Sequence, residues 1–353
     1  MRRPSHCACR ILPPALLQRI ARNGNARQRE AALDTLAVDH TLRLGRATWQ
    51  LLDAGTRHGL FGISGAGKQR SIYDAHGAEA LPGRLVRAEG APAQGDAEVN
   101  EAYDGLGATF DFFADVYDRN SIDDAGLHLD ASVHYGRRYD NAFWNGQQMV
   151  FGDGDGDLFN RFTISLDVIA HELTHGVTGD EARLVYLGQA GALNESVSDV
   201  FGSLVKQYAR RERAADADWL IGAGLFTAKV HGVALRSMKA PGTAYDDPVL
   251  GRDPQPATID GYVHTQADDG GVHTNSGIPN HAFYLAAIAL GGYAWEKAGR
   301  IWYETLRDKR MKPTATFRQF ARLTAQNAAH FFGSAERQAV TAAWAEVGIK
   351  ATG

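Results

Sequence analysis

Residues 166–175 read LDVIAHELTH, and this stretch decides the fold. On a helix, residues four positions apart share one face, so His171 and His175 can bind one cation together. Glu172 would lie beside that cation, where it can take a proton from bound water. The alternative is a surface helix with two exposed histidines, but the apolar run before His171 favours a buried helix. The motif therefore indicates a zinc hydrolase.

A third metal ligand is predicted downstream, in the stretch NESVSD at residues 194–199. Glu195 would complete a set of two histidines and one carboxylate, with a fourth position open for water. Asp199 follows one helical turn later on the same face, where it can accept the free N–H of a ligating histidine. The alternative is a helix cap with a surface carboxylate, and the upstream histidine helix argues against it.

Periodicity divides the chain into a strand-rich part and a helical part. Residues 71–95 and 127–135 alternate as strands do, and residues 97–118 have helical spacing. Further helices are expected at about 165–179, 193–211, 277–291, 294–308, 316–330 and 334–347. Residues 212–275 are rich in proline and glycine and show little periodicity. We expect an α+β fold with a β-rich lobe at 70–179, which ends in the histidine helix, and a helical lobe at 180–353.

Residues 1–60 differ from the rest because they are rich in arginine and poor in aromatic residues. Two helices are expected there, at about 14–22 and 26–53. The glycine-rich stretch at 59–68 is a linker, since no strand precedes it as a phosphate loop requires. No apolar stretch follows the basic N-terminus, so we predict no signal peptide and cytoplasmic synthesis, with export by a route that the sequence does not show.

Composition excludes several classes of protein. The chain has 353 residues, of which 44% are apolar and 22% charged, as in globular proteins. A formal net charge of −4 gives no basic excess for binding nucleic acid. No apolar run approaches the roughly 18 residues of a membrane span. Cys7 and Cys9 are too close for an unstrained bridge, so no disulfide is expected.

Further motifs follow in a fixed order: NAFWNG at 141–146, GDGDG at 152–156, GALNE at 191–195 and DDGGVHTNSG at 268–277. With HELTH, they resemble the thermolysin family of zinc metallopeptidases from about residue 70 to residue 350. The stretch CRILPPALL at 9–17 resembles the short pro-region of the protealysin-like branch. The resemblance implies a two-lobed fold with the zinc site in the cleft between the lobes. It also implies a neutral endopeptidase that cuts before bulky apolar residues and is made as a self-processing zymogen.

The resemblance also implies a role for each matching residue. His171, His175 and Glu195 would bind one zinc ion, and Glu172 would be the general base. Outside these ligands, Asp199 would orient His171 and Asn194 would steady His175. Tyr186 and His273 would donate hydrogen bonds to the oxyanion of the tetrahedral intermediate, while Asp268 fixes the tautomer and charge of His273.

Substrate contacts are implied in the same way. Asn141, the backbone of Ala142 and Arg236 would bind the main chain of a peptide. The residue after the cut bond would enter an apolar pocket lined by Phe159, Phe162, Val168 and Leu235, although core packing would give these four the same pattern. We expect protein or peptide substrates, the pro-region as an intramolecular inhibitor, no nucleic acid and a monomer.

The chain departs from the family at a calcium cluster beside the zinc helix. Asp167 and Asp218 keep carboxylates, but Lys206 replaces a bridging glutamate, and Leu220 and Ala223 replace two more acidic residues. Calcium requires several charged oxygen ligands, so we expect no calcium there and an ion pair from Lys206 to Asp167 or Asp218. The acidic turn at 153–157 is expected to cap backbone N–H groups.

Two other functions remain open, a zinc aminopeptidase and a catalytically silent binding protein on the same scaffold. The presence of Glu172, Tyr186 and His273 favours an active enzyme. For the pro-region, Pro13-Pro14 predicts an extended segment in or over the cleft. Maturation is expected within residues 50–70, before Leu60, Phe61 or Ile63. A thiolate of Cys7 or Cys9 on the zinc is a further hypothesis.

Overall fold

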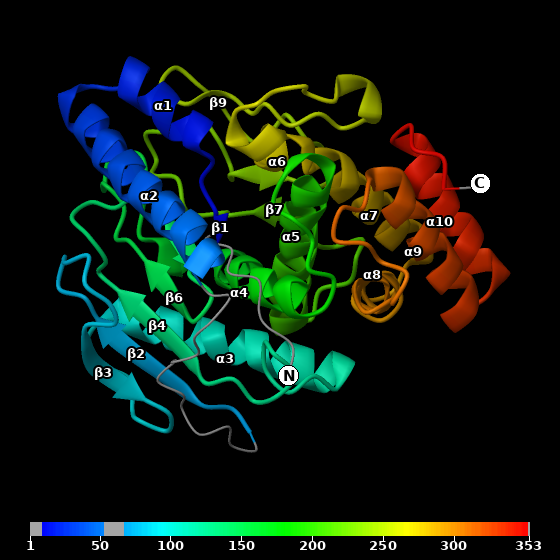
Figure 1. Cartoon of the computed structure of the whole chain (residues 1–353), viewed down its shortest axis with the longest axis horizontal. Helices are drawn as coiled ribbons and strands as arrows, with labels where there is room; N and C mark the ends of the chain where they lie inside the picture. The colour runs from blue at the N-terminus through cyan, green and yellow to red at the C-terminus, as the bar shows by residue number, and fades with distance from the viewer. Residues whose placement is uncertain (1–8, 53–66, 352–353) are drawn as a thin grey trace.

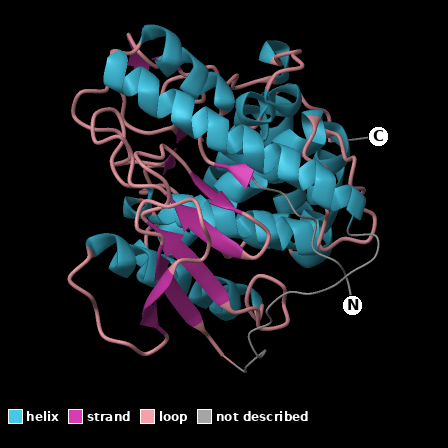
Figure 2. Cartoon of the chain, turned by 60° about the vertical axis from the view of Figure 1, so that its left-hand side comes forward, coloured by secondary structure: helices cyan, strands magenta, loops and turns pink. Residues whose placement is uncertain are grey.

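The computed structural model describes the backbone of residues 9–52 and 67–351, and the side chains of 9–42 and 67–351. Figure 2 shows the strands gathered on one side of the molecule and helices over the rest. The expected α+β fold is confirmed. The expected break near residue 180 falls between two helices, and the lobe boundaries themselves remain predictions.

The main sheet of the described chain contains strands in the order β1-β5-β6-β4-β2-β3. Their bounds are β1 Cys9–Arg10, β2 Arg70–Asp74, β3 Arg84–Ala88, β4 Leu129–Val133, β5 Ala142–Trp144 and β6 Gln148–Phe151. Strands β2, β4 and β6 run parallel, and the remaining neighbours pair antiparallel. Strand β1 comes from the pro-region and lies at the edge of the sheet, beside β5.

Helix α3 (Ala97–Tyr117) packs on the sheet and buries Leu106, Phe110 and Phe113. It begins after Asp96, whose carboxylate accepts hydrogen bonds from the N–H groups of Glu98 and Val99. A 3₁₀ turn, η1 (Phe162–Ile164), leads into α4 (Leu166–Asp180), which packs against both α3 and α5 (Gly188–Arg210). Helix α4 is therefore held between α3 and α5.

Helices α6 to α10 follow α5 along the chain and lie towards the side of the molecule that carries the C-terminus (Figure 1). Their bounds are α6 Asp268–Asn275, α7 Gly277–Leu290, α8 Ala298–Leu306, α9 Phe317–Phe331 and α10 Ser334–Glu346. The buried indoles of Trp302 and Trp344 stack between α8 and α10, with ring centroids 6.2 Å apart. In the part of the chain that the structure describes, no helix is long and apolar enough to cross a membrane.

Residues 212–275 contain more regular structure than their sequence indicated. Two short antiparallel pairs form there, β7 (Leu220–Ile221) with β8 (Arg236–Ser237) and β9 (Asp246–Asp247) with β10 (Gly251–Arg252). A 3₁₀ turn, η2, covers Ile259–Gly261. Strands of two residues are too short to show a period, which is why they were not predicted.

The segment expected to be a pro-region supplies β1, α1 (Pro14–Asn23) and α2 (Ala26–Leu52). Pro14 starts α1 because a first helical residue needs no N–H donor. Helix α1 buries Leu16, Leu17 and Ile20; in Figure 1 it lies beside β9, and α2 runs diagonally below it. No disulfide was expected, and this prediction was wrong, because Cys9 is disulfide-bonded. Cys9 therefore also offers no thiolate to a metal. Cys7 and the expected cuts before Leu60, Phe61 and Ile63 lie outside the described residues.

Candidate active site

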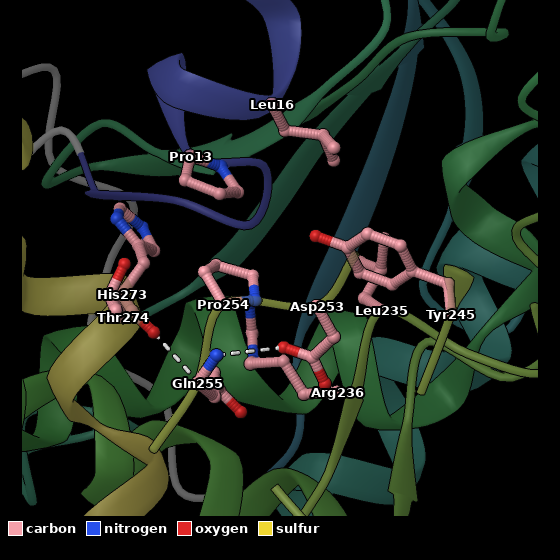
Figure 3. Close-up of a pocket in the computed structure, with 10 residues that line it drawn as sticks. All are labelled: Pro13, Leu16, Leu235, Arg236, Tyr245, Asp253, Pro254, Gln255, His273 and Thr274. Carbon is pink, nitrogen blue, oxygen red and sulfur yellow. Dashed lines mark hydrogen bonds between the residues drawn. The ribbon is translucent and has the colours of Figure 1, made fainter. Parts of the chain in front are cut away.

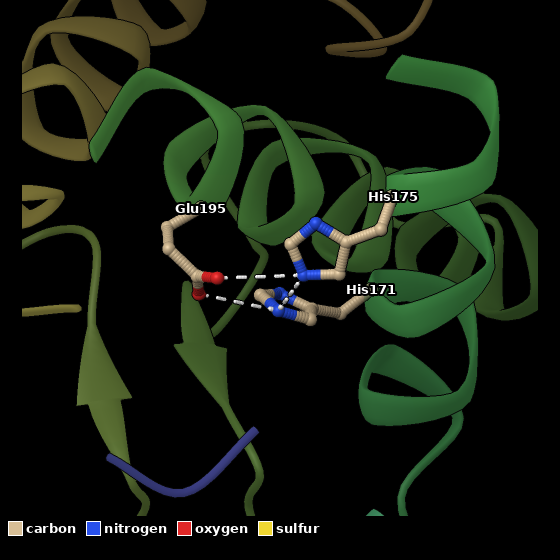
Figure 4. A group of neighbouring side chains, drawn as sticks. All are labelled: His171, His175 and Glu195. Carbon is tan, nitrogen blue, oxygen red and sulfur yellow. Dashed lines mark hydrogen bonds and ion pairs between the residues drawn. The ribbon is translucent and has the colours of Figure 1, made fainter. Parts of the chain in front are cut away.

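Helices α4 and α5 bring the three predicted metal ligands together (Figure 4). The Nε2 atoms of His171 and His175 lie 3.1 Å apart. Each lies 3.4 Å from a carboxylate oxygen of Glu195. All three side chains are buried. The spacing of four on one helix and the start of the next helix thus produce a single cluster.

This cluster fits a zinc ion. Two ring nitrogens cannot face each other at 3.1 Å unless a proton or a cation lies between them. Oε2 of Glu195 is buried and has no hydrogen-bond donor among the described residues. Two imidazoles and one carboxylate are a ligand set typical of catalytic zinc. A second group, Glu98, His134 and Asp153, also has metal-ligating atoms close together, but its side chains are partly or fully exposed.

Side chains behind the ligands orient them. His171 Nδ1 lies 2.8 Å from Asp199, and His175 Nδ1 lies 2.8 Å from Asn194 Oδ1. Arg236 forms two hydrogen bonds with the Asp199 carboxylate, at 2.9 and 2.8 Å. Burial alone would raise the pKa of Asp199, but Arg236 and His171 hold that pKa below its ordinary value. Asp199 is therefore ionised and accepts the His171 N–H.

Glu172 lies on α4, and its side chain contacts strand β5. Its Oε2 accepts a hydrogen bond of 3.1 Å from the backbone N–H of Trp144. The other oxygen, Oε1, has no partner in the described structure. Burial raises the pKa of Glu172 to about 8. One carboxylate oxygen is thus anchored and the other is available to exchange a proton.

Tyr186, His273 and Asp268 meet on the other side of the ligands. The Tyr186 hydroxyl donates to Glu195 and lies 3.2 Å from His273 Nε2. Asp268 lies 2.6 Å from His273 Nδ1. Burial opposes the charged imidazole, but Asp268 and Glu195 raise the pKa of His273 to about 9. Sequence patterning suggested a glycine-rich loop here, whereas the structure forms α6, with Asp269–Gly271 at positive φ.

The pro-region occupies the cleft beside these groups. Strand β1 pairs antiparallel with β5, and the backbone oxygen of Arg10 lies 2.8 Å from His273 Nε2. Arg236 Nη1 donates to the oxygen of Ile11 at 3.1 Å. The N–H of Leu12 donates to Asn141 Oδ1 at 3.0 Å, and that of Ile11 to the oxygen of Ala142 at 3.3 Å. The groups expected to bind a substrate main chain thus bind residues 10–12.

Little space remains between the pro-region and the second lobe. A cavity of only about 20 Å³ lies there, roughly enough for one water molecule. Its walls, shown in Figure 3, are Pro13, Leu16, Leu235, Arg236, Tyr245, Asp253, Pro254, Gln255, His273 and Thr274. The start of the pro-region therefore covers the cleft closely.

The four predicted pocket residues, Phe159, Phe162, Val168 and Leu235, are all buried. They belong to the same apolar core as Ile11, which is 0% exposed. Core burial alone would give the same result, so their role in specificity remains a prediction.

Sequence analysis overlooked three residues of the site, Arg10, Asp39 and Asn280. Asn280 donates a hydrogen bond of 2.8 Å to Asp199, and Asp39 forms an ion pair of 2.9 Å with Arg10. Asn280 lies on α7 and Asp39 on α2, far from the motifs along the chain. No local pattern marks such residues, because only the folded chain brings them to the cleft.

Lys206 lies where an ion pair was expected in place of calcium. Its ammonium nitrogen lies 2.8 Å from both Asp167 and Asp218 and donates to the oxygen of Leu220 at 2.6 Å. The expected ion pair is confirmed, with both carboxylates. In the acidic turn, one oxygen of Asp155 accepts from three backbone N–H groups within the described chain, as expected of a capping carboxylate.

Helix α4 carries two imidazoles and a carboxylate with one free oxygen, and Glu195 of α5 completes the set of metal ligands. This combination defines a zinc-dependent metallopeptidase. Residues 39–179 match the thermolysin metallopeptidase catalytic domain, and residues 182–349 match its alpha-helical domain. The chain therefore belongs to the thermolysin family of zinc metalloendopeptidases.

Relatives of nearly the same length support this assignment. An extracellular metalloprotease of Pectobacterium carotovorum subsp. carotovorum is 55% identical, covering 97% of this chain and 96% of the relative. Protease PrtS of Photorhabdus sp. is 48% identical, covering 96% of this chain and 92% of the relative. The solved precursor of protealysin from Serratia proteamaculans is 54% identical with a TM-score of 0.88, covering 97% of this chain and all of that one.

Proposed function

We propose that the protein is a zinc endopeptidase that cuts before bulky apolar residues and that its pro-region blocks the cleft until it is removed. The observation that carries the proposal is the position of residues 10–12, which contact His273, Arg236 and Asn141 through their main chain. A peptide bound in this way exposes one carbonyl to the metal ligands. The relative from Pectobacterium carotovorum is named as extracellular, and we infer that this enzyme also acts outside the cell.

His171, His175 and Glu195 would bind the zinc ion, which supplies an activated water and polarises the substrate carbonyl. Glu172 takes the proton from the attacking water and passes it to the leaving amine. Tyr186 and His273 donate hydrogen bonds to the oxygen that becomes negative. Arg236 and Asn141 hold the main chain after the cut bond, so the next side chain faces the apolar wall that includes Leu235.

Replacing the base tests this mechanism. Glu172→Gln keeps the three ligands and should retain zinc, yet lose hydrolysis of an N-blocked peptide by at least ~10²-fold. The peptide's blocked end also separates an endopeptidase from an aminopeptidase. Glu346→Gln, an exposed position on α10, is the matched control and should keep full activity. Appreciable cleavage by pure, zinc-loaded Glu172→Gln would contradict the mechanism.

A further inference from the structure

The main-chain contacts of the pro-region identify one particular peptide bond. We propose that the active site cuts the Arg10–Ile11 bond of its own chain, so that the pro-region is a slowly hydrolysed, substrate-like inhibitor. This inference rests on the proposed endopeptidase function. It adds a processing site distinct from the maturation expected within residues 50–70.

Direction and register place this bond at the reacting position. Arg10 pairs with Phe143, and its carbonyl oxygen lies 2.8 Å from His273 Nε2, the expected oxyanion donor. After this carbonyl, the chain continues to the Ile11 oxygen at Arg236 and the Leu12 N–H at Asn141. The groups expected to bind the main chain after the cut therefore follow in the right order. The residue after the bond, Ile11, is apolar and fully buried, as the expected specificity requires.

Glu172, the proposed general base, lies beside strand β1. Glu172 is anchored to the N–H of Trp144, the residue that pairs with Cys9. Its other oxygen accepts no hydrogen bond within the described structure. In the cut, the oxygen of a water molecule adds to the carbonyl carbon of Arg10 while Glu172 takes a proton. The C–N bond then breaks, and Ile11 leaves as an amine that receives this proton. In Figure 4 the N-terminal strand passes beside the three metal ligands.

Both ends of the cut bond remain bound, which explains why the inhibitor persists. On one side, Arg10 forms a buried ion pair with Asp39 at 2.9 Å, and each side chain is only 3% exposed. Asp39 also accepts hydrogen bonds from Tyr139 at 2.7 Å and from Asn141 at 3.2 Å. On the other side, Leu12 and the buried face of α1 fix the new N-terminus. Because carboxylate and amine stay adjacent, re-formation of the bond competes with release.

The first experiment measures the termini of the freshly purified, zinc-loaded full-length protein. After denaturation and reduction, intact-mass analysis should find a fraction of chains that begin at Ile11, together with the released fragment 1–10. Glu172→Gln should show neither, even when mixed with active enzyme, because the bond lies within the chain's own cleft. A terminus at Ile11 in Glu172→Gln, alone or in the mixture, would overturn the proposal.

The second experiment weakens the ion pair that holds Arg10, the residue before the cut bond. Asp39→Asn removes the charge that fixes Arg10 and should raise the cut fraction several-fold. Asp34→Asn makes the same change at an exposed position of α2 and should behave as the unaltered chain. An equal cut fraction in both variants would show that the ion pair does not retain the product.

The two hypotheses fail in different ways. If the preparation hydrolyses casein but no chain begins at Ile11, the inference is wrong and the proposed function stands. If the preparation with its pro-region removed hydrolyses neither casein nor an N-blocked peptide, the proposed function itself is wrong.

Discussion

Asp199 connects the metal ligands to the substrate-binding arginine. Among the described residues, it receives hydrogen bonds from Arg236 and Asn280, it pairs with His171 at 2.8 Å, and it is completely buried. A carboxylate surrounded by donors keeps both the imidazole and the guanidinium in one orientation. The position of Asn280 therefore affects zinc binding and substrate binding through the same anion.

Asn280→Ala should weaken this arrangement without removing any ligand. Loss of a hydrogen bond to a charged group costs about 1.5–3 kcal/mol, so kcat/KM should fall about 10- to 100-fold. Zinc should also leave faster, as measured by transfer to a coloured chelator. Arg322→Ala, at an exposed position on α9, is the control. Unchanged zinc release in Asn280→Ala would contradict a positioning role.

Residues within a motif could be predicted from sequence, whereas residues that act across the fold could not. His171 and His175 share one helix, so their common face follows from helical geometry. Asn280 lies on another helix, and Asp39 belongs to a segment with no catalytic motif. Their contacts depend on how helices pack, which a single sequence does not specify.

At the scale of elements, Lys206 joins α5 to α4 and to the turn before β7. Burial alone would lower the pKa of Lys206, but Asp167 and Asp218 raise that pKa above its ordinary value, so the ammonium stays charged. Asp167 is 0% exposed, and removing one partner of a buried ion pair costs about 3–5 kcal/mol. Lys206→Ala should therefore lower the melting midpoint clearly.

The same lysine predicts how stability responds to calcium. In a Glu172→Gln background, which cannot digest itself, calcium should leave the melting midpoint unchanged. Lys206→Glu adds a third carboxylate beside Asp167 and Asp218, and this variant should be stabilised by calcium. Melting curves with millimolar calcium, or with a chelator that leaves zinc bound, make the comparison. A large rise in the midpoint of the unaltered Lys206 chain would contradict the prediction.

His134 links the start of α3 to the loop after β6. It lies 2.8 Å from Asp96, which caps α3, 3.0 Å from Asp153 and 3.6 Å from Glu98. The hydrogen bond with Asp153 raises the pKa of His134 to about 10, against about 6.5 in an unfolded chain. Because its pKa is higher in the folded protein, the protonated His134 stabilises the fold fully at pH values below its pKa in the unfolded chain. This stabilisation is lost as the pH rises through its pKa in the folded protein.

His134→Gln should therefore destabilise the protein most at low pH. The difference in melting midpoint from the parent should be largest near pH 6 and should shrink towards pH 10. Measurement in the Glu172→Gln background avoids self-digestion. His330→Gln, at an exposed position on the last turn of α9, provides the matched control. A difference that grows with pH would contradict the assigned ion pairs.

Long elements were predicted closely and short ones were not. The helices expected at 97–118 and 316–330 form at Ala97–Tyr117 and Phe317–Phe331, because many turns repeat the same apolar spacing. In contrast, α6 spans Asp268–Asn275, and Asp269–Gly271 depart from helical geometry. The strands between β7 and β10 depend on contacts with other segments rather than on their own residues.

At the scale of the molecule, the pro-region contacts segments that lie far apart along the chain. Gln28 donates to Asp157 at 2.8 Å, while Arg19 donates to the oxygen of Arg252 at 3.0 Å. Helices α1 and α2 and strand β1 thus cover the cleft. A single cut after them, in the chain that connects the pro-region to β2, would leave these contacts intact until the segment dissociates.

Maturation should be carried out by the enzyme itself. The purified active protein should be cut within residues 50–70, whereas Glu172→Gln should remain full length under the same conditions. Gel mobility with N-terminal sequencing over time distinguishes the two. Processing of pure Glu172→Gln at the normal rate would contradict self-processing.

The order of segments along the chain has a consequence for synthesis. Leu12 and Asn141, which are hydrogen-bonded in the cleft, lie 129 positions apart, and the pro-region comes first. A growing chain leaves the ribosome from its N-terminus, so the blocking strand already exists when β5 and α4 emerge. Because it is tethered, its effective concentration is high as soon as the cleft takes shape. On the proposed function, the nascent protease thus never has a formed cleft without its inhibitor, whereas an inhibitor at the C-terminus would arrive only after the enzyme was complete.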